Sequence, residues 1–183
     1  ETEVSKDYIN EVFSAFAAKI DKGIEKAVEM GNGLVPTYFT HEAVDFEPVV
    51  DENGNPVMSH YGLQKAVVKE FKTVALPYFL EGPARMMGYV DTDTAREMFN
   101  NVKKTDIYDS KLGMYKTSAS IEECSMENGR CRAFTPGWQE RENVFLHMEY
   151  KYMLAMIKAG LYDEFYETVT RALVPFLDPN MYG

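Results

Sequence analysis

The sequence predicts a mainly α protein built from paired inner and outer helices, with a small β or irregular segment. Two observations favour this fold class. The stretch 144–157 is apolar almost all the way round a helix, which is typical of a helix buried among other elements. After Gly160, the apolar residues of 161–176 recur at helical spacing on one face, which indicates a half-buried helix. A buried helix followed by a half-buried one is the pattern of a two-layer all-α architecture.

The second of these helices has a clear division into faces. We expect a turn at 158–161 that lets Leu161 pack back on Met156. The expected inward residues are Leu161, Phe165, Val169, Ala172, Leu173 and Phe176. The expected polar face consists of Asp163, Glu164, Glu167, Thr168 and Arg171.

Length and composition favour a single domain over 1–183 that has enough apolar residues for a core. The net charge of −10 and the pI of about 4.8 argue against a nucleic-acid partner, which needs a basic face. No apolar run is long enough to cross a membrane. Cys124 and Cys131 form no CxxC pair, so we expect reduced cysteines, no metal site and a cytoplasmic protein, although a disulfide remains the alternative.

The first helix is predicted to begin after Ser5, whose hydroxyl suits an N-cap. Acidic residues lie early in it and lysines late, the order that suits the helix dipole. The segment 31–33, Gly-Asn-Gly, is expected to end it. Its apolar stripe consists of Tyr8, Ile9, Val12, Phe13, Phe16, Ile20, Ile24, Ala27 and Val28.

The following region changes character. Residues 43–50 alternate between apolar and acidic side chains, and 51–56 reads as a turn, so 43–50 and 57–60 are predicted to form a small hairpin. His41 and His60 flank it as loop histidines rather than ligands. The stretch 63–74 is rich in β-branched residues, which favours an irregular or extended structure over a helix.

Further along, Pro83 is predicted to break any regular helix, while Glu81 and Arg85 have the spacing of an ion pair. Asp91 or Thr92 should cap a helix that runs to about Lys104. Its expected inward residues are Ala95, Met98, Phe99 and Val102. The connection 108–116 is rich in turn-forming residues.

The candidate functional residues lie in 129–147. If 139–157 is one helix, Glu140 and His147 share a face, with Arg132 and Arg141 close in sequence. A carboxylate accepts hydrogen bonds from sugar hydroxyls, and arginine binds phosphate with a bidentate fork. The pattern therefore indicates an anion or polyol pocket. The alternative is that Glu140 pairs with Arg141 or Arg132 and that His147 is a core histidine.

The spacing of eight residues in this stretch resembles glycoside hydrolase family 94, the cellobiose and related glycoside phosphorylases. The matching residues are Gly129, Arg130, Phe134, Pro136, Gly137, Glu140, Phe145 and His147. The strings FLEGPAR at 79–85 and HMEYKYMLAMIKAGLYDEF at 147–165 also look similar to such proteins, and the resemblance covers about 76–183. It implies part of an (α/α)6 barrel and an inverting attack of inorganic phosphate on a β-glucoside, with no further cofactor. By position, His147 matches the phosphate-binding histidine and Glu140 a carboxylate near the sugar.

The resemblance also shows differences. The family often has Asn where this chain has Arg141, and no Asp-Trp-Asn-Asp type loop with the general acid is present. The chain is therefore expected to be a fragment of a larger catalytic domain and inactive in phosphorolysis or hydrolysis by itself. The alternative is a non-catalytic helical carbohydrate-binding or scaffold module.

The expected partners are an oligosaccharide or disaccharide and phosphate, and no membrane. The predicted substrate- and phosphate-binding set is Glu140, His147, Arg130, Arg132, Arg141 and Trp138. A partial barrel should also associate with itself or with the rest of the barrel through exposed inner-helix residues. The candidates for that surface are Phe145, Met148, Tyr152, Met153 and Met156.

Overall fold

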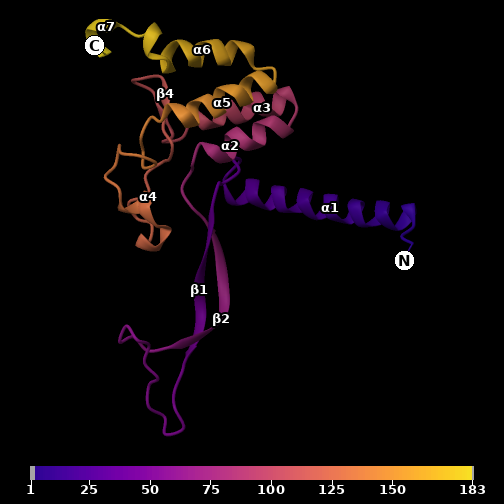
Figure 1. Cartoon of the computed structure of the whole chain (residues 1–183), viewed down its shortest axis with the longest axis vertical. Helices are drawn as coiled ribbons and strands as arrows, with labels where there is room; N and C mark the ends of the chain where they lie inside the picture. The colour runs from indigo at the N-terminus through magenta and orange to yellow at the C-terminus, as the bar shows by residue number, and fades with distance from the viewer. Residues whose placement is uncertain (1–2, 183) are drawn as a thin grey trace. The chain divides into compact units, whose positions relative to one another are not determined.

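A computed structural model describes residues 3–182, which form a mainly α protein with little sheet, as predicted (Figure 1). The described chain divides into two compact units, and the single domain expected over 1–183 stays a prediction. One comprises the residues up to Thr37 together with Leu76 onward, and the other is Tyr38–Ala75. The first unit holds every helix of the described chain and the second holds a two-stranded sheet. Among residues 3–182, no helix is both long and apolar enough to cross a membrane.

The first helix, α1, spans Lys6–Met30 and confirms the predicted element. The Tyr8 N–H donates to the Ser5 hydroxyl at 3.2 Å, which is the expected N-cap bond. The Gly31 N–H closes the helix by donating to the Ala27 carbonyl at 3.0 Å. The apolar stripe, however, is largely exposed: no residue of α1 is fully buried, and Phe13 is 66% exposed.

Gly23 within α1 and Gly31 at its C-cap should respond oppositely to alanine. A Cβ on Gly31 would lie 1.8 Å from the Leu34 carbonyl oxygen, so Gly31→Ala must displace backbone and should lower the melting temperature. A Cβ on Gly23 meets nothing within 4 Å, and alanine there should stabilise the helix by about 1 kcal/mol. Far-UV circular dichroism during thermal unfolding checks both variants. Equal melting curves would contradict the close approach at Gly31.

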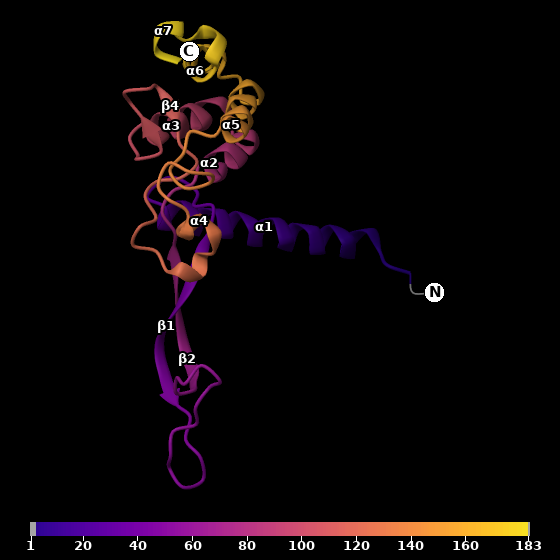
Figure 2. The same ribbon diagram turned by 60° about the vertical axis from the view of Figure 1, so that its left-hand side comes forward.

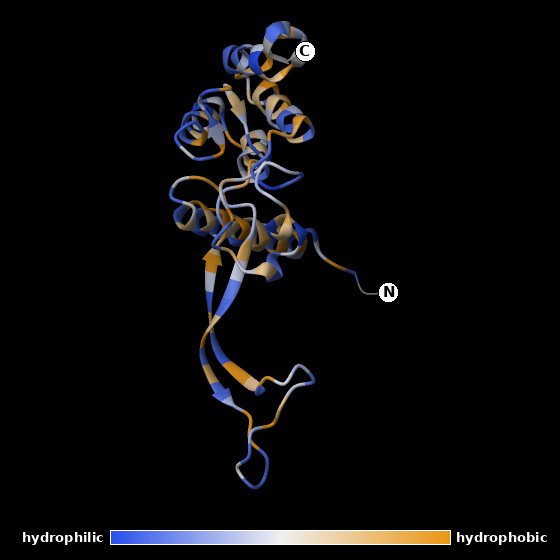
Figure 3. Cartoon of the chain, turned by 90° about the vertical axis from the view of Figure 1, so that its left-hand side faces the viewer, coloured by the Kyte–Doolittle hydropathy of each residue, from blue (hydrophilic) through white to orange (hydrophobic). Residues whose placement is uncertain are grey.

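The hairpin of the second unit is longer than predicted. Strand β1 (Phe39–Pro48) pairs antiparallel with β2 (Ala66–Ala75), from Phe39 opposite Ala75 to Pro48 opposite Ala66. The predicted partner, 57–60, forms no strand, and only its first residue pairs with the predicted segment, through the Val57 N–H and the Val49 carbonyl at 3.0 Å. The β-branched stretch after it forms the second strand instead. That stretch is extended, as the sequence predicted. Apolar and polar residues intersperse along both strands (Figure 3).

The turn at the far end of the hairpin was predicted correctly. The Asp51 carboxylate accepts hydrogen bonds from the Asn53 and Asn55 N–H groups at 2.9 and 2.8 Å. Within 57–60, Met58 also forms an isolated bridge with Gln64. His41 lies in β1 rather than in a loop, with its Nδ1 3.1 Å from the Thr73 hydroxyl.

Helix α2 spans Glu81–Met86 and corrects the prediction that Pro83 breaks a helix here. Pro83 occupies the first turn, where a backbone N–H has no partner inside the helix, so its missing donor costs nothing. The predicted ion pair between Glu81 and Arg85 is present at 2.9 Å. A 3-10 turn, η1 (Met87–Tyr89), follows.

Helix α3 spans Thr92–Val102, and its N-cap is Asp91, which accepts from the Asp93 and Thr94 N–H groups. The four predicted inward residues are all buried. The remaining short elements are β3 (Tyr108–Asp109), β4 (Met114–Tyr115), η2 (Met126–Asn128), α4 (Arg130–Ala133), η3 (Val174–Phe176) and α7 (Pro179–Tyr182).

Helix α5 spans Leu146–Lys158 and is half-buried rather than buried all round. Its solvent side carries Tyr150, Leu154 and Ile157, which are 39–51% exposed. Four of the five residues expected to form an exposed barrel edge are instead in the interior: Met148, Tyr152, Met153 and Met156. These side chains therefore serve the core of this chain.

The turn after α5 reverses the chain into α6 (Tyr162–Ala172), as predicted. The Leu161 N–H donates to the Met156 carbonyl at 2.8 Å, and Gly160 has φ +78°, a left-handed conformation that favours glycine. Thr168 was placed on the polar face but is buried, because its hydroxyl donates to the Glu164 carbonyl at 2.8 Å and needs no water.

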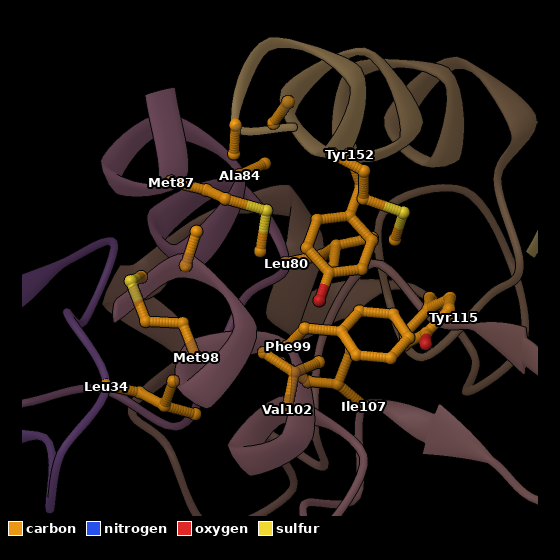
Figure 4. Packing of buried hydrophobic residues seen from close by; sticks show 14 of the residues in the cluster. Leu34, Leu80, Ala84, Met87, Met98, Phe99, Val102, Ile107, Tyr115 and Tyr152 are labelled. Atoms are coloured by element: carbon orange, nitrogen blue, oxygen red, sulfur yellow. The ribbon is translucent and has the colours of Figure 1, made fainter. Parts of the chain in front are cut away.

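The core of the first unit lies among α2, α3 and α5, which lie side by side in Figures 1 and 2. Figure 4 shows part of it: the Tyr115 and Tyr152 rings meet edge to face with centroids 4.9 Å apart, beside Phe99. The largest buried apolar side chains of this cluster include Leu34, Leu80, Met87, Val102, Ile107, Met156 and Leu161. This core fixes the start of α5, where the candidate site lies.

Candidate functional site

The segment before α5 is a tight loop. Because α5 begins at Leu146, the prediction that Glu140 and His147 share one helical face is wrong. Gln139 and Glu142 both have φ +54°, which a right-handed helix excludes. Such conformations in non-glycine residues cost free energy and concentrate at functional sites. The loop closes on itself through the Gly137 N–H, which donates to the Arg141 carbonyl at 2.8 Å.

Buried hydroxyls attach this loop to the chain at 117–118. The Thr117 hydroxyl donates to the Glu140 carbonyl at 3.0 Å, and the Ser118 hydroxyl accepts from the Glu142 N–H at 3.1 Å. The Thr117 N–H also donates to the Asn143 carbonyl at 2.8 Å. The backbone on both sides of the Glu140 side chain is therefore fixed.

Arg141 lies inside the loop and is 3% exposed. Its Nη1 donates to the Arg132 and Phe134 carbonyls, both at 2.8 Å, and its Nη2 pairs with the Glu122 carboxylate. The two terminal nitrogens thus connect three parts of the chain. Arg141 positions the loop, and both of its terminal nitrogens are occupied by protein groups.

Glu122 is a residue that sequence reasoning missed. The hydrogen bond from Arg141 and the charges of Arg132 and Arg141 hold the pKa of Glu122 below its ordinary value. Arg132 lies 3.3 Å from the same carboxylate and also donates to the Cys124 carbonyl at 2.9 Å. The available signal was an acidic pair at 122–123 upstream of two arginines. The guanidinium of Arg132, like that of Arg141, therefore binds protein groups that hold this segment in place.

One carboxylate oxygen of Glu140 is paired with an arginine, and the other has no hydrogen-bond partner. Its Oε1 pairs with Arg130, so the predicted alternative of a pair with Arg132 or Arg141 is wrong. Its Oε2 is buried and has no hydrogen-bond partner in the described protein. A buried carboxylate oxygen without a donor is costly unless another group supplies one. The oxygen therefore lacks the hydrogen bond that would offset its burial.

Trp138 and His147 are the exposed members of the predicted set. Trp138 is 56% exposed, and its ring meets Phe134 edge to face at 4.9 Å. His147 is also exposed, which excludes the core histidine. It is the second residue of α5, where backbone N–H groups lack helical partners and favour anions.

The structure brings some of the predicted residues together and leaves others apart. Arg130 and Glu140 are paired, and Trp138 belongs to the same loop as Glu140. No hydrogen bond or ion pair within residues 3–182 joins His147 to them. In the same residues no three His, Cys, Asp or Glu side chains gather as a metal-binding group, and both cysteines are free.

No family model, curated protein or solved structure matches this chain.

Proposed function

We propose that the chain forms part of a glycoside phosphorylase, or of a related glycoside hydrolase, that acts on β-glucosides with inorganic phosphate. The observation that carries the proposal is the unpartnered, buried Oε2 of Glu140. A sugar hydroxyl would supply the missing donor once the loop moves enough to expose this oxygen. The neighbouring guanidinium of Arg130 pairs with the other oxygen and orients the carboxylate.

The sugar would lie against the loop that carries Glu140. The exposed ring of Trp138 offers an apolar face on the same loop, and aromatic faces pack well on the apolar side of a sugar ring. Strained backbone at Gln139 and Glu142 supports a functional role, because the surrounding hydrogen bonds hold the loop in this costly shape.

The phosphate would lie at the start of α5, beside His147. The free N–H groups of a first helical turn and an exposed imidazole together suit a dianion. Phosphate is itself the nucleophile in phosphorolysis, so the protein needs only a general acid on the leaving oxygen and no cofactor. We expect that acid from outside these residues and the chain alone to be inactive.

The exposed apolar stripe of α1 supports the further proposal that these helices belong to a larger (α/α)6 barrel in the cytoplasm. Its large residues are 40–66% exposed, and such surfaces associate in water. We therefore expect self-association of the isolated chain, or association with the remaining barrel helices.

Kinetics of the complete enzyme test the proposed roles. His147→Ala should raise the KM for phosphate about tenfold with little change in the KM for the sugar, because one charge-assisted hydrogen bond contributes about 1.4 kcal/mol. Glu140→Gln should raise the KM for the sugar with little change in the KM for phosphate. The matched control is Glu127→Gln, an exposed acid on η2. If both variants retain wild-type kinetics, the proposed roles are wrong.

A second candidate, a non-catalytic carbohydrate-binding module, is favoured by the absence of the family's acid loop from the sequence. Fluorescence of Trp138 distinguishes the two, since it is the chain's single tryptophan. Saturable quenching by cellobiose, combined with no phosphorolysis by the complete protein, would establish the module. Quenching together with phosphorolysis would establish the enzyme.

A further inference from the structure

A groove of about 470 Å³ runs between α2 with η1 and helix α5, away from the loop described above. Both walls follow from sequence spacing. One wall carries residues 81, 84, 85 and 88, and the other carries 151, 154, 155 and 158, each set at helical spacing. Ala84, Gly88 and Ala155 are small, and a Cβ on Gly88 would meet nothing within 4 Å. Small side chains at these positions leave the space open.

The groove is basic in an otherwise acidic chain. Arg85, Lys151 and Lys158 line it, against one acid, Glu81. The Arg85 Nε and Nη2 donate to one Glu81 oxygen at 3.2 and 2.9 Å, and the Lys151 ammonium lies 3.8 Å from the same oxygen. Three cations and one anion give the lining a formal charge of +2, within a chain of net charge −10. This local excess attracts an anion.

The rim of the groove carries apolar surface. Tyr89 is 89% exposed and Leu154 is 50% exposed. An exposed tyrosine ring beside a gap lined by alanine and glycine accommodates a flat or cyclic body. A ligand that uses the whole groove therefore has an anionic end and a ring.

We infer that this groove binds a small phosphomonoester that carries a ring, such as a sugar phosphate. A phosphomonoester has a charge of about −1.5 to −2 at neutral pH, which matches the +2 of the lining. Arg85 and Lys151 bind the phosphate from opposite walls, and Tyr89 contacts the ring. The inference rests on residues other than those of the proposed function and does not depend on it.

Titration of the labelled 183-residue chain with glucose 6-phosphate, followed by nitrogen-15 NMR, tests the inference. The amide signals of Gly88 and Tyr89 should shift and saturate, whereas glucose alone should leave them in place. Arg85→Gln should weaken binding about tenfold, the equivalent of one charge-assisted hydrogen bond. Glu81→Gln should strengthen binding, because it removes the competing carboxylate.

The control is Lys104→Gln, which removes the same charge from an exposed position at the end of α3 and should change the affinity less than twofold. Opposite effects at Arg85 and Glu81 also exclude unfolding as the cause. The inference is overturned if no signal saturates, if inorganic phosphate binds as tightly as the ester, or if Lys104→Gln weakens binding as much as Arg85→Gln. Binding of a tetraglutamate peptide in place of the ester would identify the groove as a peptide site and overturn it as well.

Discussion

Arg141→Met should destabilise the loop before α5 by about 3 kcal/mol and abolish the candidate sugar site with it. The variant keeps the apolar bulk but leaves the Arg132 and Phe134 carbonyls without their donor, and each buried, unsatisfied group costs about 1–3 kcal/mol. It also releases Glu122, so the link between the loop and 122 is lost. Because Trp138 directly follows Gly137, whose N–H donates to the Arg141 carbonyl, it should become more exposed.

Denaturant unfolding monitored by tryptophan fluorescence measures this effect at the site, since Trp138 is the single tryptophan. The matched control is Arg130→Met, which removes the same charge from a side chain that is 76% exposed. Exposed ion pairs contribute below about 1 kcal/mol, so this variant should unfold close to wild type. If the two variants unfold at the same denaturant concentration, Arg141 does not hold the loop.

The second large effect concerns Glu149, a fully buried carboxyl in the first turn of α5. Its Oε1 accepts from the Tyr115 N–H at 2.6 Å, while its Oε2 has no partner in the described protein. Burial raises the pKa of Glu149, and the hydrogen bond from Tyr115 only partly opposes this. The folded protein therefore holds this proton at a pH where the unfolded chain has released it.

The sign of the pH dependence follows from linkage. Since the folded pKa is the higher one, this group lowers stability as the pH rises from the unfolded pKa through the folded pKa, and it has no effect below both. Glu149→Gln stays neutral and keeps an acceptor for the Tyr115 N–H. The free energy of unfolding of the variant should equal that of wild type in acid. At higher pH it should be larger, by about 1.4 kcal/mol for each unit by which the pKa is raised.

Urea unfolding of both proteins across the acidic to neutral range checks this prediction, with the difference between them isolating Glu149 from other titrating groups. A matched control is Glu97→Gln, on the exposed side of α3. That variant should differ from wild type by a constant amount over the same range. Parallel curves for Glu149→Gln would show that the buried carboxyl does not titrate there.

The elements that sequence predicts best are those with local end signals. Ser5 and Asp91 cap their helices through bonds within three residues, and Gly160 ends α5 through its own backbone conformation. Pairing between distant segments was not predictable in the same way. Strand β1 pairs with β2 along the full length of both strands. The local sequence pattern instead favours a shorter hairpin within 43–60.

The candidate site shows the same limit. Arg130 and Glu140 are ten residues apart and were identified individually, yet their pairing depends on the reversal at Gln139 and Glu142. Non-glycine residues seldom adopt a positive φ. The apolar periodicity therefore predicts, wrongly, that the helix includes both residues. The sequence does not predict the burial of Glu149 either, because an acidic residue in a helix normally lies on the solvent-exposed face.

The inserted hairpin has a consequence for the order of folding. Phe39 pairs with Ala75, so the formed hairpin holds Thr37 and Leu76 close together. The Thr37 hydroxyl accepts from the Gly82 N–H at 2.8 Å, a contact across a long stretch of sequence. Closing an open loop of this length costs about 3 kcal/mol in chain entropy. If the hairpin forms first, it shortens that loop, and we expect the contact between Thr37 and Gly82 to form at a lower entropic cost.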